Sequence, residues 1–320
     1  MKFKMMYSFL NSDLDIIEKA LEEAVYADSA LLREASLHLL QAGGKRIRPL
    51  FVLLAAKFGS YDIQTMKKVA VSLELIHAAS LIHDDVIDDA EIRRGEPTVK
   101  AKWDNRIAMY TGDYIFARAL ENMAEINKPD AHYILSNTMV ELVVGEIEQM
   151  KDKYRFNQSL RDYLRRIKRK TALLISASCQ LGAIAANVDK NINVKLAHFG
   201  YYVGMSYQII DDILDFTGTE EELGKPSGDD LLQGNITLPV LFAMKDQTIY
   251  SEIIKVHENM PRNEIDRIIH LIKQSDAIER SREMSNRYLE KALLILETLP
   301  ENQSKKTLKN IAKYIGKRKF

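Results

Sequence analysis

An acidic cluster directly after an apolar run is the first feature of this sequence that suggests chemistry. The stretch LIHDDVIDD at 81–89 holds Asp84, Asp85 and Asp88. On a helix, residues four apart lie on one face, so Asp84 and Asp88 converge. Like charges that close repel one another, and carboxylates carried toward an apolar interior are costly without compensation. Either this helix end is solvated or a cation binds there.

A second cluster repeats this spacing. The stretch IIDDILDF contains Asp211, Asp212 and Asp215, and a polar loop with basic residues follows each cluster. One such motif alone is well explained as a solvated helix end, but two favour a bound cation. Oxygen ligands suit Mg²⁺, which keeps several waters and usually completes its shell with substrate phosphates. The expected metal ligands are Asp84, Asp88, Asp211 and Asp215.

Basic residues lie around both acidic clusters and are candidates for binding phosphates. GGKRIRP at 43–49 places its cations on a turn between helices, and others follow the clusters or lie in RKTALL. Each alone could be a solvated surface cation or a helix cap, but the ordered set indicates an anion site. The cations are Lys45, Arg48, Arg93, Arg94, Lys170 and Lys225.

Three uncharged or weakly basic side chains accompany these cations. His77 precedes the first cluster by two turns, Gln208 precedes Asp212 by one turn, and Thr171 follows Lys170. A core position would explain His77 or Gln208 taken alone. Together with the other motifs, they are candidate hydrogen-bond partners of a ligand.

Helices must position these residues, because helical periodicity dominates the sequence and strand signals are nearly absent. Two helices, 65–89 and 203–216, are apolar on nearly every side and belong in the middle of a bundle. We therefore expect an all-α fold. The expected helices span 12–26, 29–42, 49–58, 65–89, 105–126, 129–153, 160–187, 193–217, 237–245, 262–275, 277–297 and 301–315.

Composition predicts one helical domain over 1–320 in a reducing compartment. Lys plus Arg and Asp plus Glu each number 45, so overall charge gives no reason to expect nucleic-acid binding. The single Cys179 excludes an internal disulfide and suits a buried position. We see no signal peptide and no membrane span. A cytoplasmic protein with at most transient membrane contact is expected.

The motifs resemble the full set of the trans-isoprenyl (polyprenyl) diphosphate synthases. The segments that carry the resemblance are GGKRIRP, HDDVIDDAEIRRGEPT, the KT pair at 170–171, YQIIDDILDFTG and LGKPSGDDLLQGNITLP. GEIEQMKDKYRF and the ending YIGKRKF further resemble the large catalytic component of bacterial heptaprenyl diphosphate synthases. The resemblance implies an isoprenoid synthase-type helical bundle with a central cavity between the two DDxxD motifs.

The resemblance also implies the reaction. Isopentenyl diphosphate would condense successively with an allylic diphosphate such as farnesyl diphosphate, by Mg²⁺-dependent ionisation, condensation and elimination. An all-trans heptaprenyl chain, expected to become a menaquinone side chain, would result. The residues implied in catalysis are Asp84, Asp85, Asp88, Lys170, Asp211, Asp212 and Lys225. Those implied for isopentenyl diphosphate are Lys45, Arg48, His77 and Arg94. Those implied for the allylic diphosphate are Arg93, Lys170, Thr171, Gln208 and Lys225.

Small residues before the first motif bear on product length. The product would grow along the helix that carries Asp84, past Ala79 and Ser80 and toward Ile76. A large aromatic side chain there would block the tail, and none is present. Small residues would equally allow another helix to pack closely at these positions.

The resemblance implies a partner: a smaller, non-catalytic subunit in a heterodimer, with a homodimer possible in isolation. Helices 105–126 and 129–153 are the candidate interface. Alternatives are a self-sufficient homodimeric synthase of other chain length, a class I terpene cyclase and a non-catalytic regulatory subunit. GGKRIRP and the duplicated motif disfavour the last two. The role of the extra Asp89, whose i,i+4 partner would be Asp85, stays open.

Overall fold

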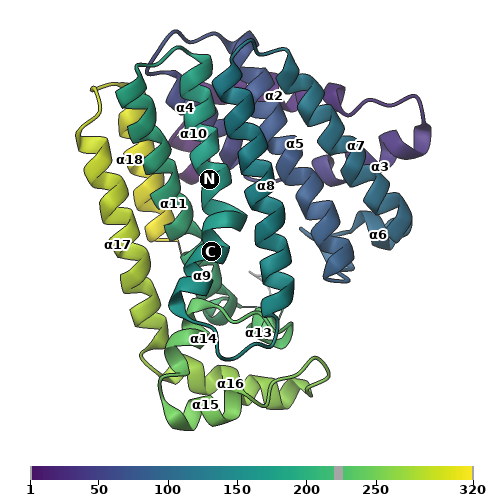
Figure 1. Ribbon diagram of the computed structural model, residues 1–320, viewed down its shortest axis with the longest axis vertical. Helices are drawn as coiled ribbons and strands as arrows, with labels where there is room; N and C mark the ends of the chain where they lie inside the picture. The colour runs from purple at the N-terminus through teal and green to yellow at the C-terminus, as the bar shows by residue number, and fades with distance from the viewer. Residues whose placement is uncertain (1, 220–225, 319–320) are drawn as a thin grey trace. The chain divides into compact units, whose positions relative to one another are not determined.

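The computed structural model describes residues 2–219 and 226–318 (Figure 1). The described residues are overwhelmingly helical, which confirms the all-α expectation. The strands among them are β1 (Ile92–Arg93) and β2 (Glu96–Pro97), which pair antiparallel with Ile92 opposite Pro97. This small hairpin lies in the loop directly after the first aspartate motif. No helix in the described part of the chain is long and apolar enough to cross a bilayer.

The chain divides into two compact units, each assembled from three separate segments. The first unit contains Met1–Met139, Ala177–Ala197 and Pro300–Thr307, and the second contains Val140–Ser176, His198–Leu299 and Leu308–Phe320. The first unit carries the motif at 84–88, and the second carries the motif at 211–215. The single domain expected over 1–320 stays a prediction.

The first unit is organised around one buried helix. Its helices are α1 (Lys2–Met5), the 3-10 helix η1 (Ser8–Leu10), α2 (Asn11–Ala24), α3 (Ala30–Gln41), α4 (Ile47–Ala56), α5 (Ile63–Ile87), α6 (Val99–Lys102) and α7 (Asn105–Ala124). α5 contacts α2, α3, α4, α6 and α7. It begins where the Asp62 carboxylate accepts the backbone N–H groups of Gln64 and Thr65. Apolar residues on every side of α5 explain its central place.

The second unit buries a core of Ile, Leu, Phe and Tyr side chains. The helices that lie wholly within it are α9 (Leu160–Ile167), η2 (Lys168–Ala172), α13 (Asp229–Leu232), α14 (Leu238–Ala243), α15 (Gln247–Ile253), α16 (Arg262–Gln274) and α17 (Ala277–Glu297). Four helices contribute residues to both units: α8 (Pro129–Asp152), α10 (Leu173–Ala185), α11 (Lys190–Thr217) and α18 (Gln303–Gly316). Because the chain passes from one unit to the other inside these helices, each unit consists of segments that are not consecutive in the sequence.

The structure corrects one expected helix in a place that matters for the site. The sequence predicted a single helix over 160–187, but η2 is a π-helical turn between α9 and α10. Such turns insert an extra residue and are frequent at functional sites. Here the turn contains Lys170 and Thr171. The short helices α6, α13 and α15 were also not expected, because they are too brief to show periodicity.

Candidate active site

The first aspartate motif lies at the C-terminal end of α5, where its carboxylates are largely buried. Asp84 is 7% exposed and Asp85 is 2% exposed. Asp88 caps the helix, and its backbone N–H bonds to the Asp84 carbonyl at 2.8 Å. Asp84 and Asp88 therefore remain one turn apart, as the spacing predicted.

Asp89 corrects an expectation. Its φ of +52° takes the chain out of the helix, so it does not become the i,i+4 partner of Asp85. Instead its carboxylate pairs with Lys100, whose ammonium also lies 3.0 Å from Glu91. Asp89 thus ties the loop after the motif to α6.

Arg93, in β1, neutralises Asp85. Its Nε and Nη2 lie 2.7 Å and 2.6 Å from the same Oδ1 atom of Asp85. Burial raises the pKa of Asp85, Arg93 lowers it, and the neighbouring Asp84 and Asp88 raise it further. The ion pair therefore favours an ionised Asp85 and fixes the hairpin against the end of α5.

A basic cluster forms around His77 within the first unit. Burial lowers the pKa of His77 well below its usual value, and nearby Arg48, Arg94, Arg93 and Arg46 lower it further. The imidazole is therefore neutral, and the positive charge of this cluster resides on guanidinium groups. Guanidinium groups gathered in this way are a good match for the oxygens of a phosphate or diphosphate ligand.

Two loops meet at this cluster. A Cβ atom on Gly44 would lie 3.0 Å from Nη1 of Arg94, so the guanidinium lies directly against the backbone of this glycine. Lys45 follows Gly44 in the same loop. Arg48 lies in the first turn of α4 rather than on the turn between helices, which corrects its expected placement. The structure thus brings Arg48, His77 and Arg94 together beside the loop of Lys45.

The second aspartate motif lies on α11, and its middle carboxylate is held from two sides. The hydroxyl of Tyr163 donates to Oδ2 of Asp212 at 2.7 Å, and Nε2 of Gln208 donates to Oδ1 at 2.9 Å. Burial raises the pKa of Asp212 to about 7, and the two hydrogen bonds oppose that rise. Asp215, at 3% exposure, is also buried.

Residues of the π-helical turn connect to this motif. The Thr171 hydroxyl donates to Oε1 of Gln208 at 2.6 Å, which extends the network to Asp212. The Lys170 ammonium lies 2.9 Å from Glu146 on α8. Thr171, Gln208 and Asp212 therefore form one continuous hydrogen-bonded chain, whereas the sequence suggested only separate roles.

The C-terminal segment also reaches the second motif. Arg318 forms an ion pair with Asp211, and its guanidinium carbon lies 5.3 Å from the centre of the Tyr207 ring. Sequence reasoning missed Arg318, although it lies in the ending that carried part of the resemblance. Lys225, a candidate from the same reasoning, lies outside the described residues.

Comparison of the chain with known proteins identifies its family. A family model described as polyprenyl synthetase matches residues 29–272. The chain is 64% identical to heptaprenyl diphosphate synthase component 2 of Bacillus subtilis (strain 168), over all of this chain and 92% of the relative. It is 62% identical to the protein of the same name from Geobacillus stearothermophilus, over the full length of both.

The chain belongs to the polyprenyl synthetase family. It is a prenyltransferase. Among solved structures, heptaprenyl diphosphate synthase from Staphylococcus aureus matches with a TM-score of 0.94 and 42% identity, over 97% of this chain and 99% of that one. A polyprenyl synthase from Caulobacter crescentus CB15, complexed with calcium and isoprenyl diphosphate, matches with a TM-score of 0.93 and 31% identity, over 99% and 98%.

The donor chemistry of this polyprenyl synthetase fits a hard divalent cation. Among the described residues, no three His, Cys, Asp or Glu side chains group closely enough to form a metal cage. Mg²⁺ needs no such cage, since one or two carboxylates, water and substrate phosphates complete its shell. Asp84 in the first unit and Asp215 in the second each offer a buried carboxylate of the kind that such an ion binds.

The residues expected to set product length lie on α5 of this polyprenyl synthetase. Ala79 and Ile76 are fully buried and Ser80 is 9% exposed. The Ser80 hydroxyl donates to the His77 carbonyl at 2.9 Å, so it is satisfied within the helix. No aromatic side chain occupies these positions, as the sequence indicated.

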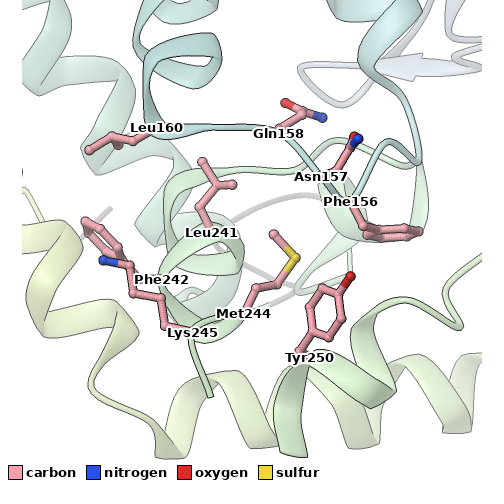
Figure 2. Close-up of a pocket in the computed structure, with 9 residues that line it drawn as sticks. All are labelled: Phe156, Asn157, Gln158, Leu160, Leu241, Phe242, Met244, Lys245 and Tyr250. Atoms are coloured by element: carbon pink, nitrogen blue, oxygen red, sulfur yellow. The ribbon is translucent and has the colours of Figure 1, made fainter. Parts of the chain in front are cut away.

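One hollow in the second unit is separate from the candidate residues. This pocket has a volume of about 390 Å³. Phe156, Leu241 and Tyr250 are among its lining side chains (Figure 2). None of the expected catalytic, substrate-binding or metal-ligating residues lines it. We therefore do not include it in the active site.

Proposed function

We propose that this chain is the catalytic component of a two-component heptaprenyl diphosphate synthase. The observation that carries the proposal is the identity of 64% and 62% with two proteins named component 2 of that enzyme. Both DDxxD motifs and the basic clusters of the family are intact in the sequence. The reaction is repeated addition of isopentenyl diphosphate to an allylic diphosphate, with farnesyl diphosphate as the primer.

The allylic diphosphate is the proposed ligand of both aspartate motifs. Mg²⁺, the proposed cofactor, would supply positive charge that stabilises the leaving diphosphate. The proposed protein ligands are Asp84, Asp88, Asp211 and Asp215, supported by Asp85 and Asp212. Positive charge from Arg93, Lys170 and Lys225 assists departure of the diphosphate, because charge that develops in the transition state is stabilised by prepositioned cations.

Thr171 and Gln208 are the proposed hydrogen-bond partners on the allylic side. Their bond to each other, and the bond from Gln208 to Asp212, support a shared role because one rearrangement would move all three side chains. Water must be excluded once the allylic cation forms. The apolar faces of α5 and α11 support that role.

Isopentenyl diphosphate is the proposed ligand of the basic cluster. Lys45, Arg48 and Arg94 provide charge, and His77 provides a neutral hydrogen-bonding group. Holding this second substrate by its diphosphate orients its double bond toward the allylic cation. Loss of a proton then completes each extension. The chain offers no dedicated base for this step, and the released diphosphate is the proposed acceptor.

The partner is proposed to be a smaller, non-catalytic component. Its docking surface is an exposed apolar stripe on α8, which we define as Val140, Val143, Val144, Ile147 and Met150. These residues recur at helical spacing, are 38% to 60% exposed and lie in the second unit. Stripes of this kind mark protein interfaces. The name "component 2" of the relatives supports a separate component as the occupant.

The proposal extends to location and pathway. A cytoplasmic enzyme with transient membrane contact fits the reducing compartment expected from one buried cysteine. A menaquinone side chain is the proposed use of the product. A self-sufficient homodimeric synthase of other chain length is the alternative.

An extension assay tests the proposal. The purified chain is incubated with Mg²⁺, farnesyl diphosphate and labelled isopentenyl diphosphate, with and without the small component, and products are sized by chromatography. We expect heptaprenyl product only from the mixture. Long product from the chain alone would instead support the self-sufficient homodimer.

Two alanine variants test the metal ligands in the same assay. Asp84→Ala and Asp211→Ala should each lose activity by orders of magnitude, because each removes a carboxylate from one motif. Asp89→Ala is the matched control, since that carboxylate pairs with Lys100 instead. Wild-type turnover in both motif variants would refute the proposed metal sites.

A further inference from the structure

The middle cation of the GGKRIRP segment has a different role from its neighbours. Arg46 turns toward two carboxylates: its Nε lies 2.6 Å and its Nη2 3.1 Å from the two oxygens of Glu18 on α2. Its Nη1 lies 3.2 Å from Oε1 of Glu74 on α5, and Nη2 also donates to the Leu40 carbonyl at 2.9 Å. One side chain therefore ties the loop to α2, α3 and α5.

These bonds engage most of the donors of Arg46. Burial alone would lower the pKa of Arg46, but the ion pairs with Glu18 and Glu74 raise it above its usual value. The Arg46 side chain is only 13% exposed. Its charge is thus matched within the protein by two carboxylates from two different helices.

The loop that Arg46 anchors has an unusual backbone and little packing on one side. Gly43, Gly44 and Arg46 have φ values of 82°, 149° and 45°, all in the region that favours glycine. For Arg46, which carries a Cβ atom, this conformation is strained. A cavity of about 610 Å³ borders the loop, with Glu18, Gly43 and Lys45 among its lining residues. The side-chain bonds of Arg46 therefore help to hold a loop that borders open space.

Glu74 connects the anchor to the basic cluster. It is 3% exposed on the apolar helix α5, and its second oxygen, Oε2, has no hydrogen-bond partner in the structure. A buried carboxylate that lacks a hydrogen bond at one oxygen stays ionised only if positive charge lies nearby. Arg46 forms an ion pair with Glu74. Burial lowers the pKa of Arg94, whose guanidinium lies against Gly44, and the negative charge of Glu74 raises it. Glu74 thus interacts with both Arg46 of the loop and, electrostatically, with Arg94 of the basic cluster.

We propose that Arg46 is a positioning residue, whose ion pairs with Glu18 and Glu74 hold the loop at 43–46 so that Lys45 and Arg48 meet the diphosphate of isopentenyl diphosphate. This inference rests on the proposed function of Lys45 and Arg48. Arg46 itself does not touch substrate. Its loss should weaken binding of one substrate and leave the other unaffected.

The test compares three variants in the complex with the small component. Arg46→Lys keeps the charge but loses the two-pronged bond to Glu18. Glu18→Gln removes the partner at a half-exposed position, where unfolding is not expected. Arg118→Lys is the matched control, because Arg118 also binds α2, through the Ala24 carbonyl, without contacting the loop.

We expect the first two variants to raise KM for isopentenyl diphosphate roughly ten-fold. KM for farnesyl diphosphate and the melting temperature should stay close to wild type, as should all values for Arg118→Lys. Calorimetric titration with isopentenyl diphosphate alone should show the same loss of affinity. A purely structural role of Arg46 would change the melting temperature, or both KM values, together.

Lys45→Ala separates failure of the inference from failure of the proposed function. If Lys45→Ala raises KM for isopentenyl diphosphate while Arg46→Lys and Glu18→Gln do not, the positioning role is refuted. If Lys45→Ala leaves that KM unchanged, the proposed substrate site itself is wrong.

Discussion

The protonation and orientation of the Asp212 carboxyl group are set by its immediate neighbours. Burial raises the pKa of its carboxyl to about 7, while hydrogen bonds from Tyr163 and Gln208 favour the ionised form. The two donors leave the carboxylate little freedom to rotate. Gln208 is in turn fixed by Thr171. The orientation of Asp212 therefore depends on residues that lie before and after the π-helical turn.

Removal of the Tyr163 hydroxyl should disturb this arrangement. Tyr163→Phe leaves one oxygen of a buried carboxylate without its donor, which costs about 1–3 kcal/mol of the free energy of unfolding. We also expect kcat to fall, because Asp212 can then turn away. Urea denaturation and the extension assay measure the two effects. Tyr7→Phe is the control, since that ring is also buried but lies in the first unit. Equal behaviour of both variants would contradict the prediction.

His77 predicts a pH dependence of stability. Its pKa in the folded protein lies well below the usual histidine value of 6.5, so below that pH the unfolded chain binds more protons at this residue. The contribution of His77 to the free energy of unfolding is therefore complete above pH 6.5 and declines as the pH falls below it. His77→Asn should remove this decline.

Urea titrations between about pH 5 and about pH 8 measure the His77 effect. The stability difference between wild type and His77→Asn should shrink as the pH is lowered. His270→Asn, at an exposed position, controls for the substitution itself. A difference that stays constant with pH would show that His77 is not held neutral.

At the level of individual residues, the sequence pointed to candidates only where a motif carried them. The aspartates, Arg48, His77 and Arg94 could be selected because spacing and neighbouring residues marked them. Arg46 could not be separated from the adjacent cations, since its partners Glu18 and Glu74 are each 28 residues away. Arg318 lies 107 residues from Asp211, and no local pattern links such distant positions.

At the scale of elements, the approach of α8 to the π-helical turn depends on one glycine. A Cβ atom on Gly145 would lie 2.7 Å from Cβ of Arg169. That contact is too short, so the two segments could not stay as close. Arg169 also pairs with Glu141 and Glu148 of α8. Gly145 thereby controls the position of the adjacent Lys170.

Gly145→Ala should therefore destabilise the protein, whereas an ordinary glycine-to-alanine substitution within a helix stabilises it. Replacing glycine by alanine within a helix usually stabilises it by about 1 kcal/mol. Here we expect a lower melting temperature and a lower kcat, because η2 must move. Asn137→Ala, at an exposed site on the same helix, is the control. A rise in the melting temperature of Gly145→Ala, with kcat unchanged, would contradict the close approach.

Product length should respond to α5. Ala79→Tyr places an aromatic ring one turn below the first motif, and we expect the main product to shorten by several isoprene units. Because overpacking a buried site can cost about 1–3 kcal/mol, the melting temperature is measured alongside the product. A folded variant with an unchanged product would mean that the tail follows another route.

Most elements could be predicted because their apolar residues recur with helical period. The extent of α5 and α11 was close to expectation for this reason. The π-helical turn could not be predicted, since it interrupts a run of helical periodicity that continues on both sides of it. The hairpin of β1 and β2 spans too few residues to produce a pattern.

For the whole molecule, the apolar stripe on α8 predicts assembly. The double variant Val143→Lys and Ile147→Lys places two charges on side chains that are 54% and 46% exposed. We expect loss of the complex with the small component in size-exclusion chromatography and loss of heptaprenyl product. The melting temperature of the isolated chain should change little. Leu294→Lys, at a 68% exposed position on α17, is the control. Unchanged co-elution would exclude the stripe as the interface.

The division into two units has a consequence for inheritance. Each unit needs three segments of the sequence, and their boundaries fall inside α8, α10, α11 and α18, and once after α17. No single recombination event can exchange one complete unit, with its aspartate motif, for that of a relative. Chimaeras made with one crossover would always mix parental halves within a unit. We therefore expect such genes to diverge by point substitution, residue by residue, rather than by transfer of modules.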